Sequence, residues 1–253
     1  NDPEIDVNVS GIALNSASTI TMSGHSGVYT GASFEKDTAD PNGKVDWVTA
    51  PLPPQICNGV PGVIKTVRKP SGGDYTTIQA AVNSATGTVM LNSNWCINID
   101  SSTYSEQVTV SSLTFTYSTN TLTIQSDPAL VSTRAAVNPP AGAFAAFQIV
   151  VSSVNIFGIS IISTNSVPYG VYASSSYVTI SSVNVDAGEK ITQAGVRVSS
   201  WSAVGYSLVT VSNAHGVWLD GSTMTAVSYS TAVADNAGFA AVYFGSADRN
   251  TVT

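Results

Sequence analysis

Five short segments in the second half of the chain repeat one four-residue plan. They are Gln-Ile-Val-Val from Gln148, Gly-Val-Tyr-Ala from Gly170, Gly-Val-Arg-Val from Gly195, Gly-Val-Trp-Leu from Gly216 and Ala-Val-Tyr-Phe from Ala241. Successive segments start 22, 25, 21 and 25 residues apart. Recurrence at this spacing is typical of a chain that coils into a solenoid, in which the same strand returns once in each turn.

The repeated plan also separates the inside of the solenoid from the outside, because alternate side chains of a strand point to opposite faces. The second and fourth residues are apolar in every segment, so we expect them to face one core: Ile149, Val151, Val171, Ala173, Val196, Val198, Val217, Leu219, Val242 and Phe244. The third residues should point outward, and the first of these is Val150. The other four are here named the aromatic–arginine stripe: Tyr172, Arg197, Trp218 and Tyr243.

Each regular turn contains two further short strands, for example at residues 178–180 and 183–185. Three parallel strands per turn predict an all-β parallel β-helix, which we place at residues 69–253. A short amphipathic helix should begin it, because Ile78, Ala81, Val82 and Ala85 fall on one helical face. Thr76 and Gln79 have the spacing of a capping box at its start.

Residues 1–68 differ from the repeats, and we interpret them as a strand-and-loop segment that packs on or caps the solenoid. Ile5, Val7 and Val9 alternate with polar residues, as in a half-buried strand. The other end shows no capping pattern after Asn250. Two interpretations are open: the sequence is a piece of a longer protein, or another copy seals that turn by strand addition or end-to-end stacking.

Composition restricts the classes of function. Only 10% of the 253 residues are charged and the net charge is −7, which argues against nucleic acid as a partner. We expect no membrane span, because no apolar run approaches about 18 residues.

The chain has two cysteines, Cys57 and Cys96. A disulfide between them would close a loop of about 40 residues, and the alternative is two buried free thiols. His25 and His215 stand alone, so we expect no metal site and no cofactor.

Three stretches form a recognisable pattern: Gly73-Asp74-Tyr75-Thr76-Thr77-Ile78-Gln79-Ala80-Ala81-Val82, then Ile97-Asn98-Ile99, then Thr103-Tyr104-Ser105-Glu106-Gln107-Val108-Thr109-Val110. Together they resemble the opening of pectin methylesterases and of the wider family of pectin-lyase-like proteins. The resemblance implies a right-handed β-helix that begins with a capping helix and a Gly-x-Tyr-x-Glu motif.

The resemblance does not extend to the catalytic motifs. An esterase of this family would carry a nucleophilic and a general acid/base aspartate in motifs that the register places at Gly195, Gly216 and Ala241. The run Ala241-Val242-Tyr243-Phe244-Gly245 resembles the last motif without its carboxylate. We therefore predict no catalytic residues for this mechanism.

A lyase would need carboxylates for Ca²⁺ and a basic residue. The nearby choices are Asp186, Glu189, Lys190, Arg197 and Asp220, which we interpret as scattered solvated charges.

The aromatic–arginine stripe is the candidate binding site. Its flat groups, about 4.8 Å apart on successive turns, would suit sugar rings or a protein partner, or would lie covered as an extension of the core. The leading expectation is a non-enzymatic, surface-structural or adhesive protein outside a bacterial cell, able to assemble into filaments. The alternative is a carbohydrate-binding or carbohydrate-active protein whose partner is a polysaccharide or host glycan.

Overall fold

The structure is a computed structural model, and it describes residues 33–36, 45–48, 62–85, 90–91, 94–115, 119–127 and 134–253. The chain divides into two compact units, Asn1–Gln55 and Ile56–Thr253. In the first unit, β1 (Ser33–Lys36) pairs with β2 (Val45–Val48) in an antiparallel hairpin. The strand expected at Ile5 to Val9 lies outside the described residues, and the packing of residues 1–61 on the solenoid stays a prediction.

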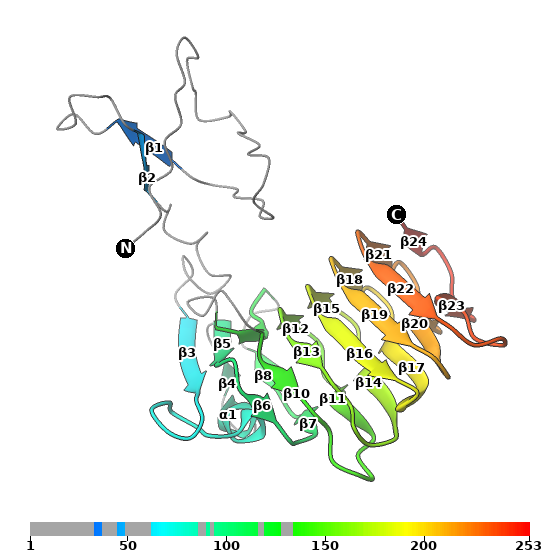
Figure 1. Ribbon diagram of the computed structural model, residues 1–253, viewed down its shortest axis with the longest axis horizontal. Coiled ribbons are helices and arrows are strands. Elements are labelled where there is room, and N and C mark those ends of the chain that lie inside the picture. Colours follow the sequence, from blue (N-terminus) through cyan, green and yellow to red (C-terminus); the bar gives the residue numbers. More distant parts are fainter. Residues whose placement is uncertain are drawn as a thin grey trace. The chain divides into compact units, whose positions relative to one another are not determined.

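The second unit is a parallel β-helix with three strands per turn, which confirms the predicted fold class (Figure 1). Its first sheet contains β7 (Val108–Val110), β11 (Ala145–Ile149), β14 (Val167–Ala173), β17 (Ile191–Val198), β20 (His215–Asp220) and β23 (Val242–Gly245). Its second sheet contains β3 (Gly62–Val67), β5 (Asn94–Ile99), β9 (Leu122–Ser126), β12 (Val154–Phe157), β15 (Val178–Ser181), β18 (Ala203–Gly205), β21 (Ala226–Ser228) and β24 (Thr251–Val252).

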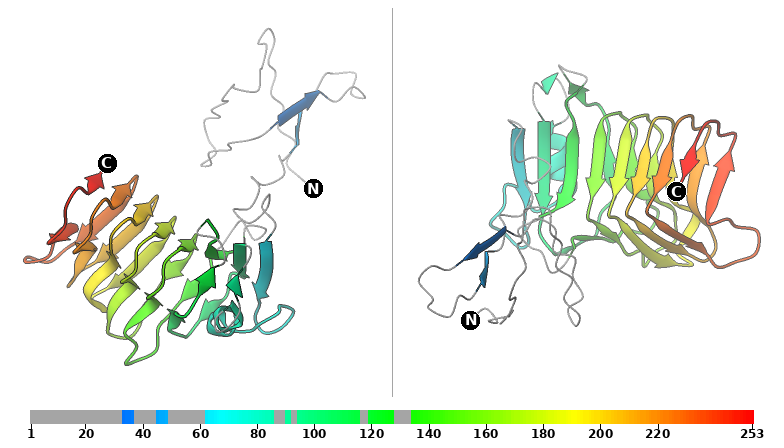
Figure 2. Two further views of the ribbon diagram at one scale, coloured as in Figure 1. Left: turned by 180° about the vertical axis from the view of Figure 1, so that it is seen from behind. Right: turned by 90° about the horizontal axis from the view of Figure 1, so that it is seen from above.

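The third sheet contains β6 (Thr103–Tyr104), β10 (Ala136–Val137), β13 (Ser160–Ile161), β16 (Asn184–Gly188), β19 (Leu208–Val211) and β22 (Thr231–Ala234). All paired neighbours in the three sheets are parallel, and Figure 2 shows them stacked turn upon turn. A small extra pair joins β4 (Met90–Leu91) to β8 (Thr114–Phe115). Strand β3 belongs to the second sheet, although the sequence analysis had placed its residues in the N-terminal segment.

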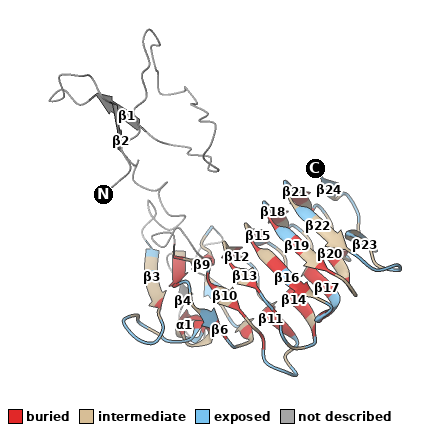
Figure 3. Ribbon diagram, viewed as in Figure 1, coloured by how far each residue is buried: buried red, intermediate tan, exposed pale blue. Residues whose placement is uncertain are grey.

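The core fills the space between the three sheets (Figure 3). Seven of the ten residues predicted to face it are buried: Ile149, Val171, Ala173, Val196, Val198, Val217 and Leu219. Val242 is half-buried and Phe244 is 49% exposed, because both lie on β23, the edge strand of the first sheet, against which no further described turn packs.

The register of the first segment needs a correction. Phe147 pairs with Val171, Gln148 with Tyr172 and Ile149 with Ala173, so that segment begins two residues earlier than predicted. A shift of two residues keeps each side chain on its predicted face, and Ile149 is therefore still buried. Val150, which was predicted to lead the outward column, follows the strand instead, and Gln148 takes its place.

Helix α1 (Ile78–Ala85) lies at the start of the solenoid and buries the four side chains predicted for its apolar face. The capping box predicted at Thr76 is wrong. Thr77 accepts a hydrogen bond from the Ala80 amide at 3.2 Å instead. The first helical amides, those of Ile78 and Gln79, donate to the carboxylate of Glu106 at 2.8 and 2.9 Å. A carboxylate from another turn suits this helix end, where the amides lack partners and the dipole is positive.

The side chain of Gln79 also completes the edge of the first sheet. Its Oε1 accepts from the Thr109 amide at 2.6 Å, and its Nε2 donates to the Thr109 carbonyl at 3.1 Å. Thr109 lies on β7, which is the edge strand at this end. The primary amide thus makes the two bonds that a neighbouring strand would make.

Tyr104 and Asp100 form a buried polar contact beside this helix. Tyr104 is fully buried, and its hydroxyl donates to Asp100 Oδ1 at 2.6 Å. The Lys69 amide donates to Asp100 Oδ2 at 2.8 Å, and the Ser102 amide donates to Oδ1 at 3.1 Å. Burial opposes the charge of Asp100, but these donors outweigh it, so the pKa of its carboxyl lies below the ordinary value. Tyr104 and Glu106, which match the Tyr and Glu of the Gly-x-Tyr-x-Glu motif, thus both have structural roles here, and Ser102 stands at the position of the motif's Gly.

Two corners of the solenoid place a residue in the left-handed region once per turn. Before the second sheet, these residues are Ser153, Tyr177, Trp201, Met224 and Arg249, with φ between 53° and 63°. After the second sheet they are Gly158, Ser182, Tyr206 and Tyr229, with φ between 48° and 66°. The corners tolerate several residue types, although bulky residues rarely adopt positive φ.

Candidate functional site

The aromatic–arginine stripe is in register on four neighbouring strands of the first sheet. Tyr172 pairs with Arg197, Arg197 with Trp218, and Trp218 with Tyr243. The structure therefore brings together the four residues that the sequence placed on successive turns. For Tyr172, Arg197 and Trp218, the residues on either side are buried in the core and hold the backbone in the sheet.

Arg197 is the centre of the stripe. Its guanidinium carbon lies 4.6 Å from the centre of the Tyr172 ring and 5.3 Å from the centre of the Trp218 ring. Its Nη2 forms an ion pair with Asp220 Oδ2, which comes from the next turn. Burial opposes the charge of Arg197, but the hydrogen bond and charge of Asp220 outweigh it, so the pKa of Arg197 lies above its ordinary value. The cation is thus held between two rings.

The rings of the stripe do not form the expected flat ladder. The Trp218 and Tyr243 rings are 5.6 Å apart with an interplanar angle of 73°, which is an edge-to-face contact. Tyr172, Arg197 and Trp218 are half-buried, whereas Tyr243 is 39% exposed. Trp218 Nε1 and Arg197 Nε are buried and have no hydrogen-bond partner among the described residues. The stripe is therefore a packed cluster with Tyr243 as its most exposed ring.

Further aromatic residues extend this cluster, and the sequence analysis missed them. Phe144, Tyr169 and Tyr172 meet with ring centres 4.8 to 5.2 Å apart. Tyr169 is only 5% exposed; its hydroxyl bonds to Gln193 Oε1, and burial raises its pKa. A spacing signal was present, because Tyr169 and His215 each lie three residues before a stripe residue and share a second column on the sheet.

His215 supports the exposed end of the stripe. Its ring stacks on Tyr243 at 4.2 Å with an interplanar angle of 13°. The Ala240 amide donates to His215 Nδ1 at 3.0 Å, so that nitrogen is unprotonated and the proton lies on Nε2. Burial lowers the pKa of His215, which also favours the neutral ring.

The charged residues considered for a lyase do not lie together in one site. Asp186 is exposed on β16 of the third sheet, and Glu189 and Lys190 are exposed in the turn that follows. Arg197 and Asp220 lie on the first sheet and neutralise each other. Within the described ranges no group of three or more His, Cys, Asp or Glu residues could hold a metal ion, and His25 lies outside those ranges.

Cys96 is buried on β5 and is disulfide-bonded. Cys57 lies outside the described residues, so the pairing of the two cysteines stays a prediction. No helix in the described part of the chain combines the length and apolar character needed to cross a bilayer.

Comparison of the chain with models of known protein families, with curated proteins and with solved structures found no match. Fold and site together define a parallel β-helix protein with an aromatic–arginine cluster on the outside of one sheet.

Proposed function

We propose that this chain is a non-enzymatic adhesive protein on or outside a bacterial cell, and that its β-helix is of the right-handed, pectin-lyase-like type. The observation that carries the proposal is the aromatic–arginine stripe, in which Arg197 is held between Tyr172 and Trp218 by Asp220. The partner we favour is a protein, because Arg, Trp and Tyr carry much of the binding energy in protein interfaces.

The rigidity of the stripe supports this proposal. A side chain that is already fixed loses little conformational entropy when a partner binds. Arg197 is fixed by its ion pair and two rings, and Tyr243 is fixed by His215 and Trp218. The edge-to-face rings favour an interdigitating protein surface over a flat sugar at this face.

An extracellular location is supported by composition and by Cys96. The low fraction of charged residues, 10%, leaves Ser, Thr and Asn to form much of the polar surface. Disulfides such as the one at Cys96 persist mainly in oxidising compartments.

The proposal can be tested with beads that carry the protein and a panel of immobilised fibronectin, laminin, collagen and mucin. Tyr243→Ala removes the most exposed ring of the stripe. Tyr206→Ala is the matched control, because Tyr206 is 65% exposed and lies at a corner beside the second sheet. We expect retention on at least one surface, a fall of about tenfold in affinity for Tyr243→Ala, and no change for the control.

Three results would contradict the proposal. They are no retention on any surface, equal retention by Tyr243→Ala, and release of methanol or unsaturated uronides from pectin. Size-exclusion chromatography of the same two variants tests the filament interpretation. Polymers that Tyr243→Ala dissolves would show that the partner of the stripe is a second copy of the chain.

A further inference from the structure

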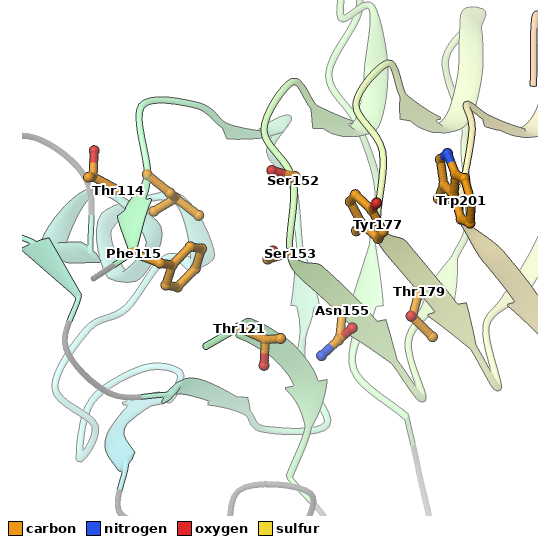
Figure 4. Close-up of a pocket in the computed structure, with 10 residues that line it drawn as sticks. Thr114, Phe115, Thr121, Ser152, Ser153, Asn155, Tyr177, Thr179 and Trp201 are labelled. Atoms are coloured by element: carbon orange, nitrogen blue, oxygen red, sulfur yellow. The ribbon is translucent and has the colours of Figure 1, made fainter. Parts of the chain in front are cut away.

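A groove of about 840 Å³ lies beside the second sheet and the corners that precede it (Figure 4). The aromatic–arginine stripe lies on the first sheet and contributes no residue to its described lining. Asn155 on β12 and Thr179 on β15 lie in its lining, with Phe115 on β8. Tyr177 and Trp201 line it from two successive corners. Its volume is typical of small-molecule sites.

Tyr177 and Trp201 form an exposed, stacked pair of rings beside this groove. Their ring centres are 6.2 Å apart with an interplanar angle of 23°, and 58% of Tyr177 and 48% of Trp201 are exposed. Unlike the edge-to-face rings of the stripe, these two present their faces in similar orientations. Both rings line the groove, so a ligand bound there can contact the two of them.

The backbone does not demand aromatic residues at these positions. Tyr177 and Trp201 have φ of 59° and 56°, a left-handed conformation that suits Gly or Asn and is strained for a bulky side chain. Ser153 holds the same corner one turn earlier. The same corner carries Met224 and Arg249 in later turns, so the fold itself does not select an aromatic ring there.

The chemistry of the lining restricts the ligand. None of the described lining residues is charged. Besides the Tyr177 hydroxyl, hydroxyl or amide groups come from six of them: Thr114, Thr121, Ser152, Ser153, Asn155 and Thr179. An apolar ligand would leave these groups without partners once water is displaced. An anionic polymer would find no cation in the lining, and the chain itself carries a net charge of −7.

We propose that this groove binds a neutral oligosaccharide, whose C–H groups contact Tyr177 and Trp201 and whose hydroxyls bond to the polar lining. A sugar has both an apolar face and a ring of hydroxyl groups, so it satisfies both halves of the groove at once. The two rings lie along the solenoid axis on successive turns, which favours a chain of several sugar units over a monosaccharide.

The test uses isothermal titration calorimetry of the full chain with cellohexaose, xylohexaose and mannohexaose, and with hexagalacturonic acid as the charged comparator. The variants are Tyr177→Asn and Trp201→Asn, because Asn accepts a left-handed backbone and should preserve the fold. The matched controls are Tyr206→Asn and Tyr229→Asn. That pair is also exposed, left-handed and stacked, with ring centres 5.1 Å apart, but it does not line the groove. Thermal unfolding verifies that all four variants are folded.

We expect at least one neutral hexasaccharide to bind, with affinity reduced at least about tenfold in Tyr177→Asn and Trp201→Asn and unchanged in the two controls. The proposal is wrong if no neutral hexasaccharide binds, if the controls lose as much affinity as the groove variants, or if hexagalacturonic acid binds as tightly. Binding by Tyr243→Ala should equal that of the wild type, which separates this site from the proposed adhesive face.

Discussion

Replacing Gly195 by Ala should destabilise the solenoid far more than one added methyl group suggests. An ideal Cβ at residue 195 would lie 2.3 Å from Val209 Cγ1 and 3.0 Å from the Gly216 carbonyl oxygen. Carbon atoms in favourable contact are about 3.5–4.0 Å apart, so the new methyl group would overlap its neighbour by more than about 1 Å. Val209 is fully buried and cannot easily move away.

The size of the effect follows from this overlap. Overpacking a core costs about 1–3 kcal/mol, and we expect the upper end because backbone and a buried side chain both obstruct the methyl group. Gly205→Ala is the matched control, since its Cβ would meet nothing closer than Ser228 Oγ at 3.7 Å. There the substitution should be neutral or stabilise by about 0.4–1 kcal/mol through the unfolded state.

Calorimetry or circular dichroism during heating measures both variants. A loss of 1 kcal/mol lowers the Tm of a chain of this size by about 2–4 °C, so Gly195→Ala should melt about 6–12 °C below the wild type. Adding Val209→Ala makes room for the methyl group, so the double variant should lose less stability than the two single losses predict. Equal Tm values for Gly195→Ala and Gly205→Ala would refute the reasoning.

Three further predictions concern charged groups, each measured by urea unfolding. Arg197→Met leaves Asp220 without its partner and should lower the free energy of unfolding by about 1–2 kcal/mol. Arg249→Met, at an exposed ion pair, should lower it by less than about 0.5 kcal/mol. Equal losses in the two variants would contradict the argument from burial. Asp100→Asn should cost about 1–3 kcal/mol at pH 7. The pKa of Asp100 in the folded protein lies below its ordinary value of 3.8, so the extra stability of the wild type over Asp100→Asn is present above about pH 4. This difference in unfolding free energy should disappear as the pH falls through the folded pKa, and a constant difference from pH 7 to pH 2 would refute the prediction. Glu106→Gln removes the charge at the start of α1 and should cost about 0.5–1 kcal/mol, a loss that high salt should reduce.

The fold could be predicted from the sequence because the repeats indicate both which side chains face the core and how far apart the turns lie along the chain. Alternation of apolar residues fixes the inside of each strand, and the return of the four-residue plan every 21 to 25 residues fixes the stacking. The register of the first segment could not be fixed this way. Ala146-Phe147-Gln148-Ile149 and the run starting at Gln148 place apolar residues at the same alternate positions, so the pattern alone does not distinguish them.

The candidate sites were only partly predictable. The stripe follows from strand alternation, so its four residues were found. The tilt of Trp218 against Tyr243 depends on side-chain torsions and on the ion pair of Arg197, which a strand pattern does not contain. The stacked pair of Tyr177 and Trp201 could not be predicted, because both residues lie in turns, where the two-residue period of strands does not apply.

The amide of Gln79 has a consequence for how the solenoid meets other chains. The unpaired N–H and C=O groups of a sheet edge can pair with an extended segment of another chain, and such pairing leads to aggregation. At Thr109 on β7, both backbone groups are already engaged by one glutamine side chain, and an incoming strand would have to displace that side chain before making its first bond. One helix side chain thus occupies the backbone groups of Thr109 at the edge of the first sheet. We expect Gln79→Ala to expose this edge and to associate with other chains more readily.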